Sequence, residues 1–278
     1  MMIVPNNIGI VSWRIKPLIW RVSCCNSHFR CKNSHNNSVS LYPTSVADRV
    51  LMDIQNSGII ACLRAKSAEL AVEAARAALR GGVSVLEITM STPGVFEALQ
   101  CLVQEYPSAS IGVGTVLDRR DAKEAVDLGA KFLMSPAMVK QGILNDVAEG
   151  QALYIPGAAT PTEILSASNG GAKIIKVYPV SALGGVEYLA AVKKPFPHIP
   201  LVASQGMKLD SVGVYIGHGA SAVVISDAIF DKKAMAERNF LLIYHLACCA
   251  ATKGTQAVRS EPLSLSLSLS LSLSLSVM

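Results

Sequence analysis

The hydrophobic pattern of the chain alternates between two kinds of segment from about residue 45 to residue 252. Short apolar runs rich in Val and Ile alternate with Ala-rich segments in which apolar residues recur at helical spacing. The short runs predict eight strands, at 58–63, 83–89, 110–114, 131–135, 152–156, 173–178, 200–203 and 221–225. The other segments predict helices at 68–79, 94–105, 119–128, 139–148, 161–168, 186–192, 209–216 and 232–251, and one more, at 46–56, precedes the first strand.

This order of elements indicates the fold class. Strands that are apolar on both faces, each followed by a helix, are typical of a parallel sheet that is covered by helices. Eight such units are the number that closes a (β/α)8 barrel. The alternative, an open doubly wound sheet, requires a Gly-rich phosphate loop after the first strand, and residues 64–67 contain no glycine. We therefore expect an α/β protein with a (β/α)8 TIM barrel and an extra N-terminal helix.

Both ends of the chain differ from this central part. Residues 1–47 contain no Asp or Glu, and their five basic residues account for the whole formal net charge of +5. An acid-free N-terminus with Arg and Ser is typical of an organellar transit peptide, with a disordered leader or a misassigned start as the alternative. The far end holds seven Leu-Ser pairs, from Leu263 to Ser276, which is low-complexity sequence.

These differences predict three parts. We expect a transit peptide or disordered leader at 1–45, a barrel domain at 46–252, and a tail at 253–278 that is disordered or an artefact of gene prediction. The expected destination of the chain is a plastid (chloroplast), with the mitochondrion or the cytoplasm as alternatives.

Composition and charge exclude several classes of protein. With 51% hydrophobic and 16% charged residues, the chain is not of the intrinsically disordered class. Beyond the leader, acidic and basic residues balance, which leaves no electrostatic footprint for nucleic acid. Apolar runs stay shorter than the roughly 18 residues of a membrane span. Seven Cys and five His show no metal-ligand or disulfide spacing. We therefore expect reduced thiols, and neither a metal, a cofactor, a nucleic-acid partner nor a membrane.

Two charged residues interrupt the apolar strands, Glu87 in the second and Lys176 in the sixth. In barrels of this class the chemistry lies at the C-terminal ends of the strands. Burial disfavours the ammonium form of lysine, so an inward Lys176 would be a nucleophile able to form a Schiff base with a ketone. Glu87 in the same lining would exchange protons near neutral pH. The alternative is a buried structural ion pair between the two.

Arg64, at the end of the first strand, has two interpretations. Its guanidinium could hold a carboxylate or phosphate, or it could lie on the surface at the barrel mouth. The Gly112-Val113-Gly114-Thr115 stretch permits a close backbone approach beside a hydroxyl donor, but alone it is a weak signal. Position alone does not decide between a binding role and a structural one.

Taken together, several stretches resemble a known family. They are 59–65, 81–82, 86–89, 112–117, 135–136, 154–157, 160–163 and 176–179. In this order, and without large gaps, residues 46–250 are similar to the bacterial aldolases of 2-keto-3-deoxy-6-phosphogluconate (KDPG) and 4-hydroxy-2-oxoglutarate (KHG). No single stretch is specific, but the set is.

The resemblance implies a homotrimeric barrel that is a carbon–carbon lyase and needs no cofactor. Such an enzyme cleaves a 2-keto-3-deoxy sugar acid or a 4-hydroxy-2-oxo acid to pyruvate and an aldehyde. By the same resemblance, Lys176 is the Schiff-base lysine and Glu87 the general acid/base. The implied substrate-binding residues are Arg64, Thr115, Pro136, Tyr178, Ser204 and Gly206.

The sequence departs from the family pattern where the family binds phosphate. The usual Thr-Gly-Gly loop is Ser204-Gln205-Gly206 here, and the usual Gly-Ser after the last strand is Ser226-Asp227. An Asp repels a phosphate dianion, and the side chain of Gln205 obstructs an approach that Gly permits. We therefore expect a substrate whose acceptor end is unphosphorylated or differently placed.

A further departure concerns the Arg that many members have four residues after the Glu, because Ser91 stands there; Arg64 instead fits a subgroup with Arg at the end of strand one. Two alternatives to the aldolase stay open. One is a non-catalytic or repurposed trimeric barrel that binds a small keto acid, and the other is a sugar-phosphate isomerase on the same fold.

Overall fold

The computed structural model describes residues 45–139, 143 and 150–275, with side chains described as far as Ser260. The chain divides into two units, 1–39 and 40–278, and everything described lies in the second. Apart from Ser45, the expected leader lies outside the described residues, as does most of the expected helix at 139–148.

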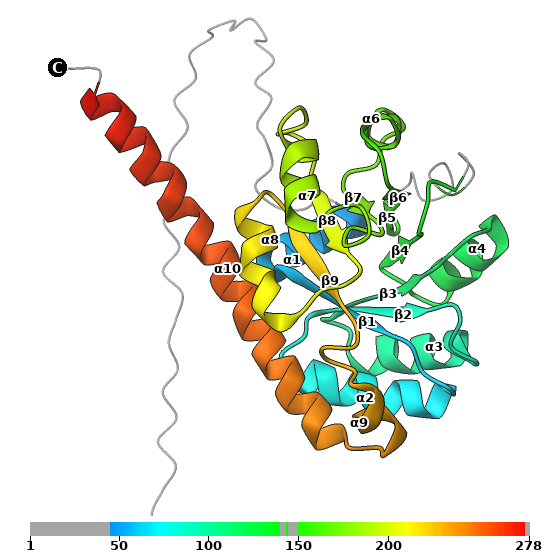
Figure 1. The fold of residues 1–278 in the computed structure, drawn as a ribbon. Helices are drawn as coiled ribbons and strands as arrows, with labels where there is room; N and C mark the ends of the chain where they lie inside the picture. Colours follow the sequence, from blue (N-terminus) through cyan, green and yellow to red (C-terminus); the bar gives the residue numbers. More distant parts are fainter. Residues whose placement is uncertain (1–44, 140–142, 144–149, 276–278) are drawn as a thin grey trace, which may run out of the picture. The chain divides into compact units, whose positions relative to one another are not determined.

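Nine parallel strands form one sheet at the centre of the second unit (Figure 1). They are β1 (Ile59–Leu63), β2 (Val85–Thr89), β3 (Ser110–Gly114), β4 (Phe132–Met134), β5 (Leu153–Ile155), β6 (Gly157–Ala158), β7 (Ile175–Val177), β8 (Leu201–Ser204) and β9 (Ala222–Ile225). All strand residues except Cys62 are buried, as a parallel sheet covered by helices requires. Each expected strand is present.

The strand order β5-β4-β3-β2-β1-β9-β8-β7-β6 places β5 and β6 at the two ends of the sheet. Only Pro156 separates these two strands in sequence, and β5 pairs with β4 while β6 pairs with β7. Because proline has no N–H to donate, the ladder is interrupted there. The carbonyl of Pro156 still accepts a hydrogen bond from the backbone N of Lys176 at 2.9 Å. One bent strand thus nearly closes a barrel of the expected (β/α)8 class.

Apart from α1, which precedes β1, the helices follow strands and cover the outside of the barrel. They are α1 (Val46–Ser57), α2 (Ala68–Arg80), α3 (Val95–Glu105), α4 (Arg119–Asp127), α6 (Pro161–Asn169), α7 (Gly185–Lys193), the 3-10 turn η1 (Leu209–Ser211), α8 (Val212–Gly217), α9 (Lys232–Ala236) and α10 (Phe240–Leu275). Side chains set where several begin: Ser45, Ser67 and Asp118 each accept a hydrogen bond from a backbone N–H three residues on.

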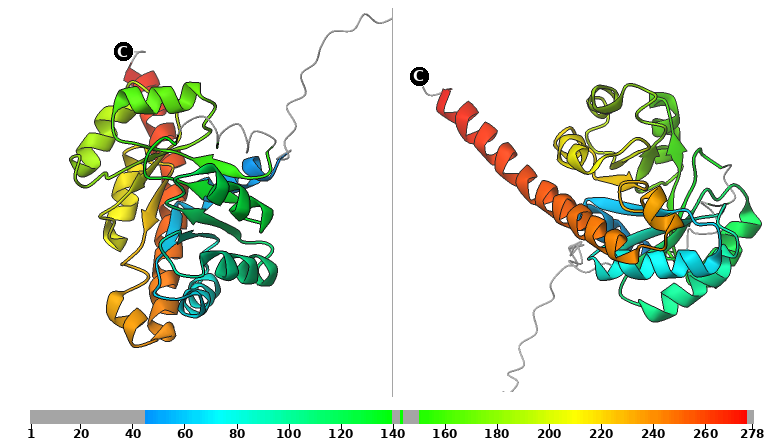
Figure 2. Two further views of the ribbon diagram at one scale, coloured as in Figure 1. Left: turned by 90° about the vertical axis from the view of Figure 1, so that its right-hand side faces the viewer. Right: turned by 60° about the horizontal axis from the view of Figure 1, so that its bottom comes forward.

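The last expected helix, 232–251, is wrong as a single element. It divides into α9 and α10 around Arg238, whose φ of 55° lies in the left-handed region. The first part of α10 lies against α2 and α8, and its backbone then continues away from them through the Leu-Ser segment to Leu275 (Figure 2). Ala257 and Val258 pack against the core, so the packing extends beyond residue 252, where the sequence placed the end of the barrel.

A separate apolar cluster fills the inside of the barrel at the N-terminal ends of its strands. Ala47, Val50 and Ile54 of α1 pack there against inward side chains from the strands. These residues, within the strands or, for Ile174, directly before one, include Ile60, Val85, Phe132, Leu153, Ile174, Val202 and Ala222. The extra N-terminal helix therefore closes one end of the barrel, and the strand C-termini are left as the end where a ligand can enter.

Candidate active site

Glu87 and Lys176 point into the barrel from opposite walls. Glu87 is central in β2 and Lys176 central in β7, and their side chains are 1% and 7% exposed. In the sheet order, β1, β9 and β8 lie between these strands on one side. On the other side lie β3, β4 and the bent strand β5/β6. The two functional groups that the sequence singled out are thus brought into one interior.

The Glu87 carboxylate occupies space that a missing side chain provides. A Cβ added to Gly114 would lie 1.4 Å from Glu87 Oε1, so only glycine at this end of β3 leaves room for the carboxylate. Glu87 Oε2 is buried and has no hydrogen-bond partner among the residues that the structure describes. A buried, unsatisfied carboxylate oxygen is unfavourable alone, and it is an open acceptor for a water or a substrate hydroxyl.

Strand β7 positions Lys176, and the side chain contacts the aromatic ring of Tyr178. Its Nζ lies 5.2 Å from the centroid of the Tyr178 ring, within the range of a cation–π contact. Within the described part of the chain, Lys176 forms no ion pair within 4.0 Å with Glu87, whose Oε2 stays unpartnered. The structural ion pair that the sequence left open as an alternative is therefore not formed.

Cys62 is a member of this interior that the sequence analysis did not identify. It pairs in register with Glu87, and its thiol senses the charges of Glu87, Lys176 and Arg64. Although Cys62 as a whole is only partly buried, desolvation of its thiol, and next the Glu87 carboxylate, raise the pKa of that thiol well above its ordinary value, while Lys176 and Arg64 oppose this. The alternation of side chains along a strand could have indicated Cys62, because it lies two residues before Arg64, the residue that directly follows β1.

Two more expected site residues, Thr115 and Pro136, lie just after β3 and β4, where the backbone is constrained. Thr115 adopts a φ of 62°, which is unusual and strained for a β-branched residue. A Cβ on Gly157 would lie 2.2 Å from the Pro136 carbonyl, so β6 and the β4 loop touch at their backbones. The hydroxyl of Ser135 bonds the Ala137 carbonyl at 2.6 Å and thereby fixes this loop.

Arg64 lies at the exposed rim of the barrel mouth. Its Nε donates a hydrogen bond to Ser91 Oγ at 3.1 Å, and Ser91 Oγ lies 3.0 Å from Thr89 Oγ1. Beside it is a cavity of about 450 Å³ whose charged lining residues are Arg64, Lys66, Asp227 and Lys232. Asp227 forms an exposed ion pair with Lys232 at 3.3 Å, which offsets part of its negative charge.

The loop after β8 has the backbone of a glycine loop, although Gln205 stands in it. Gln205 has a φ of 88° and Gly206 a φ of 77°. The Ser181 hydroxyl donates a hydrogen bond to Gln205 Oε1, which holds the side chain in place. Ser204, the last residue of β8, is buried at the barrel end. The expected positions Ser204 and Gly206 therefore lie at the strand ends, with the Gln205 side chain fixed between them.

The described residues were compared with the requirements of a metal site and of a membrane-spanning helix. No group of three or more His, Cys, Asp or Glu side chains is placed there to hold a metal ion. In the same part of the chain, no helix is both long and apolar enough to cross a membrane.

Comparison with known proteins adds independent evidence. The family described as KDPG and KHG aldolase matches residues 50–246. The KHG/KDPG aldolase of Escherichia coli is 32% identical over 177 residues, which cover 62% of this chain and 83% of that protein. The 2-dehydro-3-deoxy-phosphogluconate aldolase of Dickeya dadantii is 34% identical over 167 residues, or 58% of this chain and 78% of that protein.

Among solved structures, the chain is similar to a KDPG aldolase from Legionella pneumophila, which holds pyruvate as a covalent carbinolamine intermediate. The TM-score is 0.67 at 27% identity, over 72% of this chain and 97% of that one. A thiamine phosphate pyrophosphorylase from Pyrococcus furiosus, at 17% identity and a TM-score of 0.57, shares the fold alone. The family match spans most of the chain and includes both Glu87 and Lys176, and we conclude that the chain belongs to the KDPG and KHG aldolase family of carbon–carbon lyases.

Proposed function

We propose that the chain is a class I aldolase that cleaves a 2-keto-3-deoxy sugar acid or a 4-hydroxy-2-oxo acid to pyruvate and an aldehyde. The observation that carries this proposal is the buried Lys176 amine, which faces the open carboxylate of Glu87 across the barrel interior without an ion pair to it. A nucleophile and a proton carrier are the two groups that a Schiff-base retro-aldol reaction requires.

The proposed reaction begins at the C2 ketone of the substrate. The Lys176 amine attacks this carbon, and the carbinolamine loses water to give an iminium that accepts electrons from the C3–C4 bond. Glu87, through a water, takes the proton of the C4 hydroxyl, and the bond breaks to give the aldehyde and an enamine on Lys176. Protonation of the enamine at C3 and hydrolysis of the imine release pyruvate and the free lysine.

The remaining site residues bind and position the substrate in this proposal. Thr115 and Pro136 adjoin the pyruvyl end, and Tyr178 lines the site beside Lys176. Arg64 at the rim holds a carboxylate through its guanidinium fork, with Ser91 fixing the orientation of that fork. Ser204 and Gly206 face the acceptor end. No metal or organic cofactor takes part in these steps.

A continuous assay of pyruvate release from KHG tests the proposal. The Lys176→Ala variant should lose at least about a thousandfold in kcat/KM, because no other group replaces the nucleophile. Lys173→Ala is the matched control, since Lys173 makes a surface ion pair with Asp48 at 2.6 Å and should leave the rate unchanged. Equal pyruvate release by the Lys176→Ala variant and the wild type would refute the assignment, and no release by the wild type would favour the non-catalytic keto-acid-binding barrel.

We further propose that the acceptor end of the substrate is unphosphorylated or differently placed. The stronger support is Gln205, whose fixed side chain stands where a bare backbone would approach a phosphate. Asp227 adds weaker support, because its exposed pair with Lys232 reduces its repulsion of an anion. The ratio of kcat/KM on KHG to that on KDPG tests this, and a Gln205→Gly variant should shift the ratio toward KDPG by about tenfold. A wild-type preference for KDPG would contradict the proposal.

Targeting and assembly are also proposals. The acid-free leader supports delivery to a plastid, which a fusion of residues 1–45 to a fluorescent protein would test in plant cells. The family resemblance supports a homotrimer, which light scattering of the purified protein would test.

A further inference from the structure

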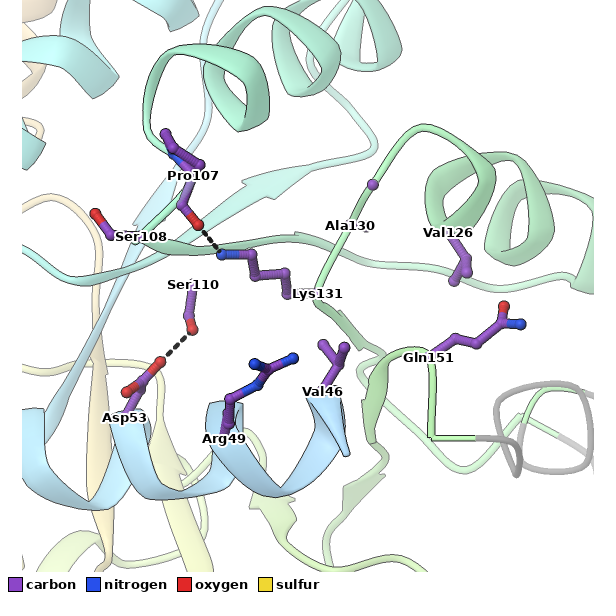
Figure 3. Close-up of a pocket in the computed structure, with 11 residues that line it drawn as sticks. Val46, Arg49, Asp53, Pro107, Ser108, Ser110, Val126, Ala130, Lys131 and Gln151 are labelled. Carbon is purple, nitrogen blue, oxygen red and sulfur yellow. Dashed lines mark hydrogen bonds between the residues drawn. The ribbon is translucent and has the colours of Figure 1, made fainter. Parts of the chain in front are cut away.

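A cavity of about 540 Å³ lies at the N-terminal end of the barrel, on the side away from the strand C-termini. It is formed between α1 and the starts of β3, β4 and β5 (Figure 3). Arg49 and Asp53 reach it from successive turns of α1, and Lys131 from the residue before β4. Its volume is in the range of small-molecule sites. None of the residues that take part in the proposed aldolase reaction lines it.

Two of its charged groups are held in place by hydrogen bonds. Asp53 Oδ2 accepts a hydrogen bond of 2.6 Å from the hydroxyl of Ser110, a residue only 1% exposed. Lys131 Nζ donates to the carbonyls of Pro107 and Ala109, at 2.5 and 2.7 Å. Carbonyl groups orient the ammonium without neutralising its charge. The wall of the cavity is therefore already ordered before any ligand enters.

The cationic charge of the cavity exceeds its anionic charge. The Arg49 guanidinium has no hydrogen bond or ion pair with any residue that the structure describes, and it extends toward Lys131 (Figure 3). Burial lowers the pKa of Lys131, and so does Arg49, while Asp53 opposes both. Two cations thus face one carboxylate, and a bound anion would relieve the repulsion between them.

We propose that this cavity binds a small oxyanion, the carboxylate or phosphate group of a hydroxylated metabolite. The free guanidinium of Arg49 offers the planar fork that matches a carboxylate or phosphate, and Lys131 adds a point charge from a second element. The uncommitted Asp53 oxygen and the hydroxyl of Ser108, which also lines the cavity, suit hydroxyl groups of the ligand.

Titration calorimetry of the full chain at constant ionic strength tests the site with two probes, inorganic phosphate and D-gluconate. Saturable binding of either one is expected, and whichever binds identifies the oxyanion that the cavity accepts. Arg49→Gln and Lys131→Met should each weaken this binding by about tenfold or more, because each removes a charge-assisted hydrogen bond. Arg49 is exposed, so Arg49→Gln decides the result if Lys131→Met does not fold.

Two control variants distinguish binding in this cavity from a general effect of charge and from binding at the barrel mouth. Arg80→Gln removes one exposed positive charge elsewhere, and Arg64→Gln removes a cation at the opposite end of the barrel. Arg80→Gln should bind the probes as the wild type does, and Arg64→Gln should retain the component of binding that Arg49→Gln weakens, whatever binds at the barrel mouth. No saturable binding, no component of binding that Arg49→Gln weakens, or loss of that component in Arg64→Gln would each overturn the proposal. None of these results depends on whether the chain is an aldolase.

Discussion

At the scale of single residues, the site depends on whether particular positions carry a side chain as well as on its charged groups. Glu87 fits because Gly114 has no side chain, and Gln205 is conspicuous because it holds a backbone conformation that favours glycine. Neither relation is visible in the hydrophobic pattern, since each joins residues on different strands or loops. The candidate nucleophile and acid were predictable because a charge inside an apolar strand is rare.

A Gly114→Ala substitution tests the close approach of Glu87. The added methyl would overlap Glu87 Oε1, so the carboxylate must move. We expect a free-energy loss of about 1–3 kcal/mol and a large fall in kcat. Gly213→Ala is the matched control, because nothing lies within 4 Å of its new methyl, and in a helix it should be neutral or stabilising by about 0.5–1 kcal/mol. Urea titration and the pyruvate assay measure the two effects, and an unchanged Gly114→Ala protein would contradict the geometry.

Cys62 gives a prediction with a defined pH direction. Its raised pKa keeps the thiol protonated through neutral and mildly alkaline pH, where an ordinary thiol is partly ionised. Iodoacetamide at pH 8 should therefore alkylate the exposed Cys249 much faster than Cys62 in the folded protein. Peptide mass spectrometry after timed quenching measures both rates, and equal rates would show that the Glu87 charge and burial do not act on this thiol.

At the scale of elements, strands were predicted better than their connections. Period-2 and apolar-run patterns are local, so each expected strand is present near its predicted bounds. The continuation of the fifth strand beyond Pro156 required the partners β4 and β7, which local sequence does not reveal. The break at Arg238 is another such case, because a left-handed arginine carries no propensity signal.

The start of α6 offers a test at this scale. The Thr160 hydroxyl accepts a hydrogen bond from the Glu163 backbone N, while the Glu163 carboxylate accepts from the Thr160 backbone N, which makes a capping box. Thr160→Ala should lower the free energy of unfolding by about 1 kcal/mol, as measured by chemical denaturation. The Thr160→Ser variant retains the hydroxyl and should keep the wild-type free energy of unfolding. A Thr160→Ser protein as unstable as Thr160→Ala would contradict this capping role.

At the scale of the whole molecule, α1 closes one end of the barrel and leaves the other for chemistry. The sequence predicted this extra helix but not its place, because burial of Ala47, Val50 and Ile54 inside the barrel is a tertiary contact. The last helix also extends the packed region beyond the end that composition predicted, since Ala257 and Val258 contact the core before the Leu-Ser pairs begin.

Two truncations distinguish the packed part of α10 from the repeat. A chain that ends at residue 262 loses only the Leu-Ser segment and the C-terminal Val277 and Met278, and should melt as the full chain does. A chain that ends at 252 also loses Ala257 and Val258, and should be less stable by about 2 kcal/mol. Calorimetric melting of the two proteins compares them, and equal stability would show that residues 253–262 contribute no packing.

The Schiff base on Lys176 can be tested directly by trapping its covalent bond to pyruvate. Borohydride added with pyruvate should reduce an imine on one lysine, and peptide mapping should place a single reduced pyruvyl group on Lys176. Lys173, three residues earlier, should remain unmodified. A lysine other than Lys176 as the labelled residue, or no adduct at saturating pyruvate, would contradict the Schiff-base mechanism on this barrel.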